Sequence, residues 1–183
     1  MLELGVIGVI VAVTIVICNS LVRLRETGDA AWADIDVQLK RRYDLIPNAV
    51  ETVKGYASHE RETLEAVVAE RSNAMSAQGP GAKAEAEGAL SGALKSLFAL
   101  AEAYPDLKAA GGFQELQGTL SEFEQQLAQA RGYYNAVVRD FNTRAQTFPS
   151  VLIARSLGFN EREFFEATEA EKELPRVSFS DDS

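Results

Sequence analysis

Cysteine and histidine are almost absent from this chain of 183 residues, which contains one of each, Cys18 and His59. A single cysteine excludes a disulfide within the chain, and one histidine with one cysteine cannot build the nitrogen and sulfur sites that bind zinc. His59-Glu60 begins like the zinc-protease motif, but Thr63 stands where the motif requires its second histidine. This leaves only all-carboxylate sites for a metal, and we expect no metal site and no cofactor.

Positive charge is also scarce, with 18 Lys and Arg against 27 Asp and Glu and a formal net charge of -9. Nucleic acids are bound through basic surfaces, so we expect no nucleic-acid partner. Proline is rare, whereas Ala, Leu, Glu, Gln and Arg are abundant, and this bias favours helices.

The sequence lacks the motifs that carry common enzyme chemistry. It has no Gly-x-x-x-x-Gly-Lys-Ser/Thr phosphate loop and no Gly-x-Gly-x-x-Gly turn. No nucleophile elbow is present, and His59 is the only histidine that could serve as a base for a serine. Carboxylates abound, but on helix faces expected to be exposed. We therefore predict that the protein is not an enzyme.

What the sequence does contain is an uncharged apolar run from Leu4 to Val22. As a helix it would be roughly 28 Å long, close to the hydrocarbon thickness of a bilayer. A cleaved signal peptide is the alternative, but it needs a basic start and a small-residue cleavage site. Here Glu3 is the only charge before the run and Leu-Val-Arg-Leu-Arg25 follows it. The pattern favours an uncleaved single-pass anchor.

The flanks of this run predict its orientation. Arg23 and Arg25 follow it, and no Lys or Arg precedes it. Under the positive-inside rule we expect a protein of the inner membrane, with its N-terminus outside and its C-terminal domain in the cytoplasm. Gly5, Gly8 and Ala12 share one face of the anchor, and small residues of this kind let membrane helices associate.

Apolar residues continue beyond the anchor at steps of three and four, the spacing of one helical face. They are Leu21, Leu24, Gly28, Trp32, Ile35, Leu39, Tyr43, Ile46, Val50, Val53, Ala57, Leu64, Val67 and Val68. The spacing predicts that the anchor continues into a first long helix that ends near Ala77, ahead of a turn at Gly79-Pro80-Gly81. Pro47 lies within it, and because the apolar stripe keeps its phase we favour a kink there over a break near Asp44.

Two further helices are predicted, Ala82–Tyr104 and Phe113–Phe148, joined by a loop after Pro105. The second would be roughly 50 Å long and could lie antiparallel to the first arm. Two short helices follow, Val151–Leu157 and one from Asn160 to Glu173, where Asn160 and Glu163 resemble a capping box.

The predicted fold is therefore all-α: an antiparallel bundle of three to four long helices plus short C-terminal helices, with a membrane anchor continuous with the first long helix. We divide the chain into the anchor, residues 1–22, the bundle, 23–174, and an extended tail, 175–183.

Several motifs, taken in order, resemble one family, LemA. They are Trp32, the run from Asp34 to Asn48, Val53-Lys-Gly-Tyr56, His59-Glu60, the run from Ala101 to Lys108, Phe113-Gln-Glu-Leu-Gln117, Tyr134-Asn135, Phe148-Pro149, Gly158-Phe159 and Phe164-Phe165. The resemblance implies a long-helix antiparallel bundle behind a single N-terminal anchor, with the N-terminus outside. It implies no settled enzymatic activity.

We expect the functional surface to be an interface. The only basic triplet, Lys40-Arg41-Arg42, could contact lipid head groups, or pair with carboxylates of its own bundle or of a neighbour. The candidate interface residues are Lys40, Arg41, Arg42, Tyr43, Asp44, Pro47, Phe164 and Phe165. The sequence favours a membrane-anchored scaffold that assembles with itself and contacts membrane lipid. Another membrane protein is a further candidate partner. The alternative is an adaptor that regulates a membrane protease or sensor.

Overall fold

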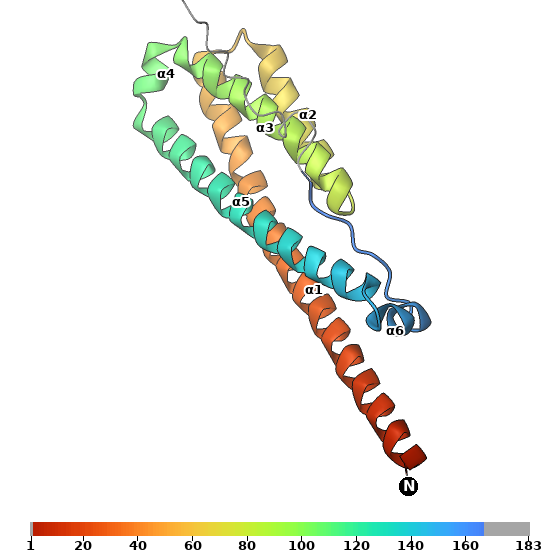
Figure 1. Cartoon of the computed structure of the whole chain (residues 1–183). Helices are drawn as coiled ribbons and strands as arrows, with labels where there is room; N and C mark the ends of the chain where they lie inside the picture. Colours follow the sequence, from red (N-terminus) through yellow and green to blue (C-terminus); the bar gives the residue numbers. More distant parts are fainter. Residues whose placement is uncertain (1, 167–183) are drawn as a thin grey trace, which may run out of the picture.

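The computed structural model describes residues 2–166, which form six helices and no strand (Figure 1). The helices are α1 (Leu2–Tyr56), α2 (Arg61–Ser76), α3 (Pro80–Glu102), α4 (Pro105–Ala109), α5 (Gly111–Gln146) and α6 (Ser150–Ser156). The all-α class is confirmed, and so is the continuity of the N-terminal apolar segment with the first long helix. The proposed tail, 175–183, lies outside the described residues.

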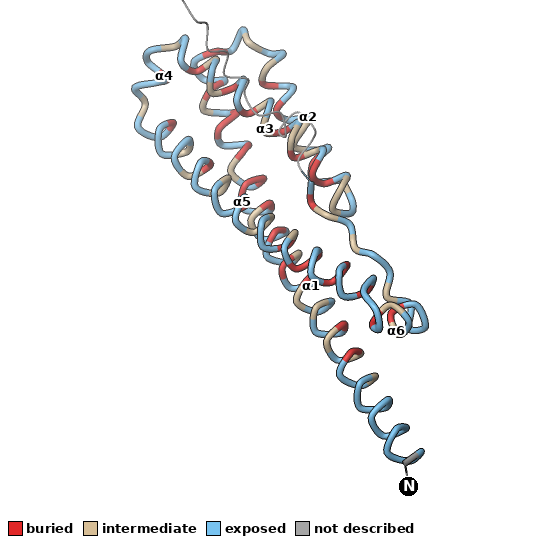
Figure 2. The backbone as a smooth tube through the Cα atoms, viewed as in Figure 1, coloured by how far each residue is buried: buried red, intermediate tan, exposed pale blue. Residues whose placement is uncertain are grey.

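Helix α1 has two parts with different surroundings. Its N-terminal part extends beyond the bundle, and its large apolar residues from Leu4 to Val16 are exposed. Figure 2 colours this end of the helix as exposed. From Ala31 onward, the residues of the stripe at Ile35, Leu39 and Ile46 are buried. This helix is the one described element long and apolar enough to cross a membrane.

Pro47 lies inside α1 without ending it, so the alternative of a break near Asp44 is wrong. Proline has no backbone N–H, and the carbonyl of Tyr43 therefore loses its partner within the helix. Arg71 of α2 replaces that partner, because its Nε lies 2.8 Å from the Tyr43 carbonyl oxygen. The helix therefore continues through Pro47, and the Tyr43 carbonyl accepts its hydrogen bond from Arg71 instead of from the backbone.

The first helix does not continue to Ala77, and that prediction is wrong. The chain reverses at residues 57–60, where the N–H of Glu60 bonds the carbonyl of Ala57, and α2 begins at Arg61. The sequence from Ser58 to Thr63 is polar throughout, so the apolar stripe is interrupted there. Reversal lets Leu64 and Val67 pack on the same core instead of extending past the end of the bundle.

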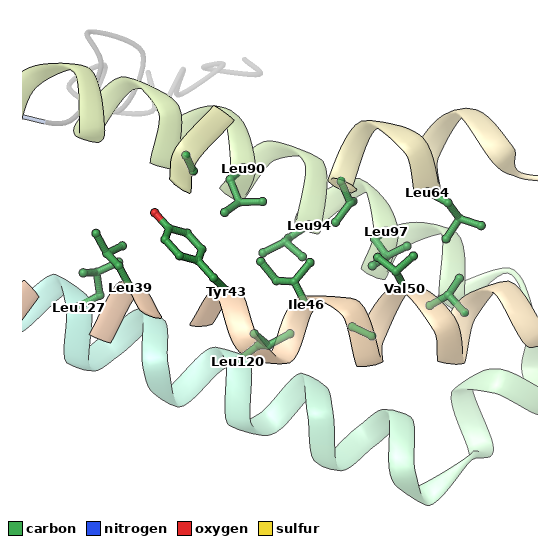
Figure 3. Close-up of a cluster of buried hydrophobic side chains, with 14 of the residues drawn as sticks. Leu39, Tyr43, Ile46, Val50, Leu64, Leu90, Leu94, Leu97, Leu120 and Leu127 are labelled. Carbon is green, nitrogen blue, oxygen red and sulfur yellow. The ribbon is translucent and has the colours of Figure 1, made fainter. Parts of the chain in front are cut away.

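The main core lies where α1, α2, α3 and α5 face one another. Figure 1 shows α1 and α5 running side by side in opposite directions, as predicted, with α2 and α3 packed along the upper part of α1. Figure 3 shows the side chains between them: Leu39, Tyr43, Ile46, Val50, Leu64, Leu90, Leu94, Leu97, Leu120 and Leu127. Part of the predicted loop after Pro105 is instead the short helix α4.

A second, smaller core lies where α1 leaves the bundle. It joins Ile17 and Leu21 of α1 to Phe141 and Ala145 of α5 and Ala154 of α6. Helix α6, Ser150–Ser156, matches the predicted short helix at 151–157 to within a residue. It brings the end of α5 back against α1.

The predicted helix from Asn160 is wrong over residues 160–166, which are not helical; its remainder lies outside the described residues. Asn142 bonds both backbone groups of Arg162, and Asn135 bonds both backbone groups of Phe165. Seven helical residues of α5 and three extended residues each span about 10 Å, whereas three helical residues span only about 4.5 Å. The two asparagines therefore require an extended chain. We call residues 160–166 the strap.

Candidate functional site

A buried ion pair lies at the centre of the bundle. Arg42 of α1 is 3% exposed and Glu87 of α3 is 1% exposed. The Nη1 of Arg42 lies 2.7 Å from Oε2 of Glu87, and its Nη2 lies 2.8 Å from Oγ of Ser91. Tyr43 donates its phenolic hydrogen to the other carboxylate oxygen of Glu87. Both oxygens of this buried carboxylate are therefore bonded.

The pair extends into a network that joins α1, α3 and α5. The Nη2 of Arg42 also lies 3.0 Å from Oε2 of Glu124, and Oε1 of Glu124 lies 3.2 Å from Nη2 of Arg131. Arg131 in turn lies over the ring of Phe165, 5.4 Å from its centroid. One arginine of α1 thus binds carboxylates from two other helices, and the network reaches the strap.

Burial changes the acidity of the groups at the centre. It raises the pKa of the Glu87 carboxyl, while the hydrogen bond from Tyr43 and the charge of Arg42 act in the opposite direction. Burial raises the pKa of the Tyr43 phenol, and the hydrogen bond to Glu87 and its charge add to that effect. Tyr43 therefore stays protonated and acts as a donor. A protonated phenol and a bonded carboxylate, both buried, hold the helices together.

The strap is fixed to α5 and α1 by polar and aromatic contacts. Besides the two asparagine clamps, the hydroxyl of Tyr134 donates to the carbonyl of Glu163 at 2.9 Å. Phe165 is buried beside Trp32 of α1, with ring centroids 5.9 Å apart, and Trp32 also faces Tyr134 at 5.3 Å. The strap thus completes the core between α1 and α5.

Near the small core the contacts are more exposed. The Nη2 of Arg162 lies 2.7 Å from Oδ1 of Asp29, and its Nη1 lies 3.4 Å from the carbonyl of Arg25. The guanidinium of Arg25 lies over the ring of Phe159, 5.6 Å from its centroid. These charged contacts surround the small apolar core and do not enter it.

The predicted interface residues separate into two groups. Lys40, Arg41 and Asp44 are exposed on α1, and so is Pro47. Arg42 and Tyr43 are buried, and Arg42 pairs with carboxylates of its own bundle, which is one of the predicted alternatives. A contact with a second copy through the exposed residues stays a prediction.

The remaining predicted residues lie on other surfaces. Phe165 is buried and Phe164 is half-buried, and both pack against the main core of this chain. Gly5, Gly8 and Ala12 are exposed, and a Cβ built on either glycine would meet nothing within 4 Å. The structure leaves that face open, and its role in helix association stays a prediction.

Sequence reasoning missed the carboxylates that pair with Arg42. Glu87 lies three residues before Leu90 and seven before Leu94, so the spacing places it on the apolar face of α3. A carboxylate in such a position signals a buried partner, and we could have inferred one. Asn135 and Asn142 are also seven residues apart, but nothing in the local sequence links them to the strap.

The arrangement of the helices defines a class of protein. It is an antiparallel helical bundle, tied at its centre by buried ions, whose first helix extends as a single apolar segment long enough to span a membrane. The LemA family model matches residues 31–179. The chain belongs to the LemA family.

Curated relatives agree with this assignment. The chain is 23% identical to "Magnetosome protein MamQ" of Magnetospirillum gryphiswaldense, over 90% of this chain and 71% of that protein. It is 25% identical to "Magnetosome protein MamQ 2" of Paramagnetospirillum magneticum, over 81% of this chain and 64% of that protein. It is 27% identical to "Protein LemA" of Metamycoplasma hominis, over 84% of this chain and 71% of that protein.

Proposed function

We propose that this protein is a membrane-anchored helical scaffold that assembles with itself and organises lipid or partner proteins, without catalysing a reaction. The observation that carries the proposal is α1, a single helix of 55 residues that is apolar and exposed at one end and forms the core of the bundle at the other. A continuous helix couples the orientation of the bundle to that of the membrane segment. Such coupling suits a structural protein.

The chemistry of the bundle supports a structural role. Burial raises the pKa of both Glu87 and Tyr43, and these two buried groups bond one another inside the bundle, where Glu87 also bonds Arg42. Perturbed acidity at an open cleft points to catalysis, but perturbed acidity in a sealed network is what structural ion pairs produce. Among residues 2–166 no group of three or more His, Cys, Asp or Glu side chains is placed to hold a metal ion.

Electron microscopy of the full chain extracted in mild detergent tests the proposal. We expect large, regular homo-oligomers. A monomer or dimer that purifies with a different membrane protein would contradict self-assembly and favour the adaptor role, regulating a protease or sensor.

The exposed basic residues of α1 are the surface through which we expect copies to meet. Lys40→Glu with Arg41→Glu reverses two exposed charges and keeps Arg42, whose substitution would disturb the core. Native mass spectrometry should show fewer copies per particle. The matched control is Lys95→Glu with Lys108→Glu, two exposed positions on α3 and α4. Equal assemblies for both variants would exclude this surface as the interface.

The orientation is a separate part of the proposal, and it is supported by Arg23 and Arg25 after the apolar run. A Met75→Cys variant in a Cys18→Ser background places one exposed thiol on α2. An impermeant maleimide should leave it unlabelled in intact cells and label it after lysis. Labelling in intact cells would place the bundle outside.

A further inference from the structure

Apolar side chains gather on the surface where α5 turns into α6. Phe148 is 76% exposed, Leu152 62% and Leu157 57%. Single exposed apolar residues are common on proteins, but here three of them lie within ten residues of chain, which concentrates apolar surface at this turn. We call residues 147–159 the α5–α6 corner.

The corner lies beside the apolar segment of α1. A groove of about 860 Å³ separates them, lined on one side by α1 residues from Ala12 to Leu24 and on the other by residues from Asp140 to Ser150. At its inner end Ile17 and Leu21 pack against Phe141 and Ala154. Figure 1 shows α6 beside α1 at the point where α1 leaves the bundle. The corner is therefore level with the C-terminal part of the uncharged run, Leu4–Val22.

The length of the apolar segment of α1 determines how deep in a bilayer the corner would lie. The thirteen residues from Leu4 to Val16 lie before the small core and span only roughly 20 Å as a helix. A bilayer has a hydrocarbon thickness of about 30 Å, which requires the whole run to Val22. When α1 crosses the membrane, Leu21 is then at the hydrocarbon edge and Ile17 lies roughly 6 Å deeper. The parts of α5 and α6 packed on them are at the same depth.

We propose that the α5–α6 corner is a second membrane contact, in which Phe148, Leu152 and Leu157 insert into the boundary between head groups and acyl chains of the bilayer that α1 crosses. This inference rests on the anchoring part of the proposed function. It gives the exposed side chains of Phe148, Leu152 and Leu157 an apolar environment. With contacts at both α1 and the corner, the bundle is held at a fixed tilt and rotation.

The charges around the corner match the interfacial region. Arg144 and Arg155 lie in the last turns of α5 and α6, and Arg23 follows the apolar run of α1. Apolar side chains that enter the boundary with arginines at head-group level are the pattern of interfacial helices. Asp140 of α5 also lines the groove, eight residues before Phe148 in the sequence. The occupant we infer is an anionic lipid surface.

Depth-dependent quenching tests the contact on the full chain. Leu152→Cys and Leu157→Cys, each in a Cys18→Ser background, are labelled with an environment-sensitive fluorophore and reconstituted in vesicles of phosphatidylcholine and phosphatidylglycerol. Matched labels go on Val9, inside the apolar run, and on Val68, exposed on α2. We expect shallow quenchers on the lipid to quench positions 152 and 157 several-fold more than deep ones. Position 9 should respond to deep quenchers and position 68 to neither.

The outcomes separate the two proposals. If position 9 is quenched and positions 152 and 157 behave like position 68, the corner contact is overturned and the anchor stands. If position 9 is not quenched, the anchor itself fails. If positions 152 and 157 are shielded from water but not quenched by lipid, and the shielding grows with protein density, a second copy covers the corner and the lipid contact is overturned.

Discussion

The centre of the bundle and its lower end, where the apolar segment of α1 leaves it beside α6, are built on opposite principles. At the centre, Arg42 and Glu87 are buried and bonded, and the charge network joins three helices. At the lower end the small core is entirely apolar, and the charged contact of Asp29 with Arg162 is partly exposed at its edge. The first arrangement specifies which residues meet, while the second provides apolar contact without fixing a register.

The need for specific contacts at the centre follows from the repetitive sequences of the long helices. The apolar stripes of α1 and α5 repeat at steps of three and four, so a shift by seven residues would still pair apolar with apolar. A shift of α1 against α5 would separate Arg42 from Glu124, and a shift of α1 against α3 would separate it from Glu87. An uncompensated buried charge costs several kcal/mol. We infer that the central ions set the register and that the end of the bundle follows.

The largest predicted effect is at Glu87. Glu87→Ala leaves Arg42 buried without its main partner and should lower the free energy of unfolding by about 3–5 kcal/mol. Denaturant unfolding of the full chain in detergent measures this, with exposed Glu85→Ala as the control. Because well-packed apolar residues can replace a buried ion pair, Arg42→Met with Glu87→Leu should recover most of the loss. Equal stability of Glu87→Ala and Glu85→Ala would contradict a central role for the ions.

The strap provides a second comparison. Asn142→Ala removes both hydrogen bonds to Arg162, and we expect a loss of about 1–3 kcal/mol that is confined to the strap and its surroundings. Hydrogen exchange at the amides of Arg162 and Phe165 should accelerate. Asn73→Ala, which removes an exposed contact to Glu70, is the control. Unchanged exchange in the strap would show that the clamp does not hold it.

Pro47 and Arg71 form a pair that can be separated by a double-mutant cycle. Arg71→Met leaves the Tyr43 carbonyl without its side-chain donor and should lower the free energy of unfolding by about 1–2 kcal/mol. Pro47→Ala restores a backbone N–H to the same carbonyl, so the loss from Arg71→Met should shrink in that background. If the two effects simply add, the contact does not compensate for the proline.

The smallest predicted effect is at the edge of the lower end of the bundle. Asp29→Asn removes one ion pair to Arg162, and exposed pairs of this kind contribute about 0.2–1 kcal/mol. The difference from the unaltered chain should disappear in high salt, because screening weakens exposed pairs. Exposed Asp36→Asn on the same helix is the control. A loss that persists in high salt would mean that this end also depends on ions.

Periodicity predicted most of the helices because their packing is repetitive. The stripe of α1 and the stripe of α5 are long enough to identify both helices and their antiparallel pairing. The reversal at residues 57–60 was missed because a polar gap of a few residues is also compatible with an uninterrupted helix. The strap was missed because its conformation depends on Asn135 and Asn142, which are distant in sequence, and its local residues resemble a helix start at Asn160.

The candidate site was predicted only in part, for a physical reason. Lys40, Arg41 and Arg42 look alike in sequence, but only Arg42 is on the face of α1 that points toward α3 and α5. Arg42 lies three residues after Leu39 and four before Ile46, which is the spacing of the apolar stripe. A helical projection of α1 would therefore have distinguished buried Arg42 from exposed Lys40 and Arg41. The identity of its partner carboxylates could not be predicted in this way, because it depends on how three helices align.

The most direct test of the account is the number of copies in one particle taken from a membrane with its own lipids. The full chain, of 19.9 kDa, is extracted with an amphipathic polymer and the particles are weighed singly by mass photometry. The account predicts particles that contain many copies of this chain and little other protein. Particles that hold one copy, alone or bound to a different membrane protein, would contradict it.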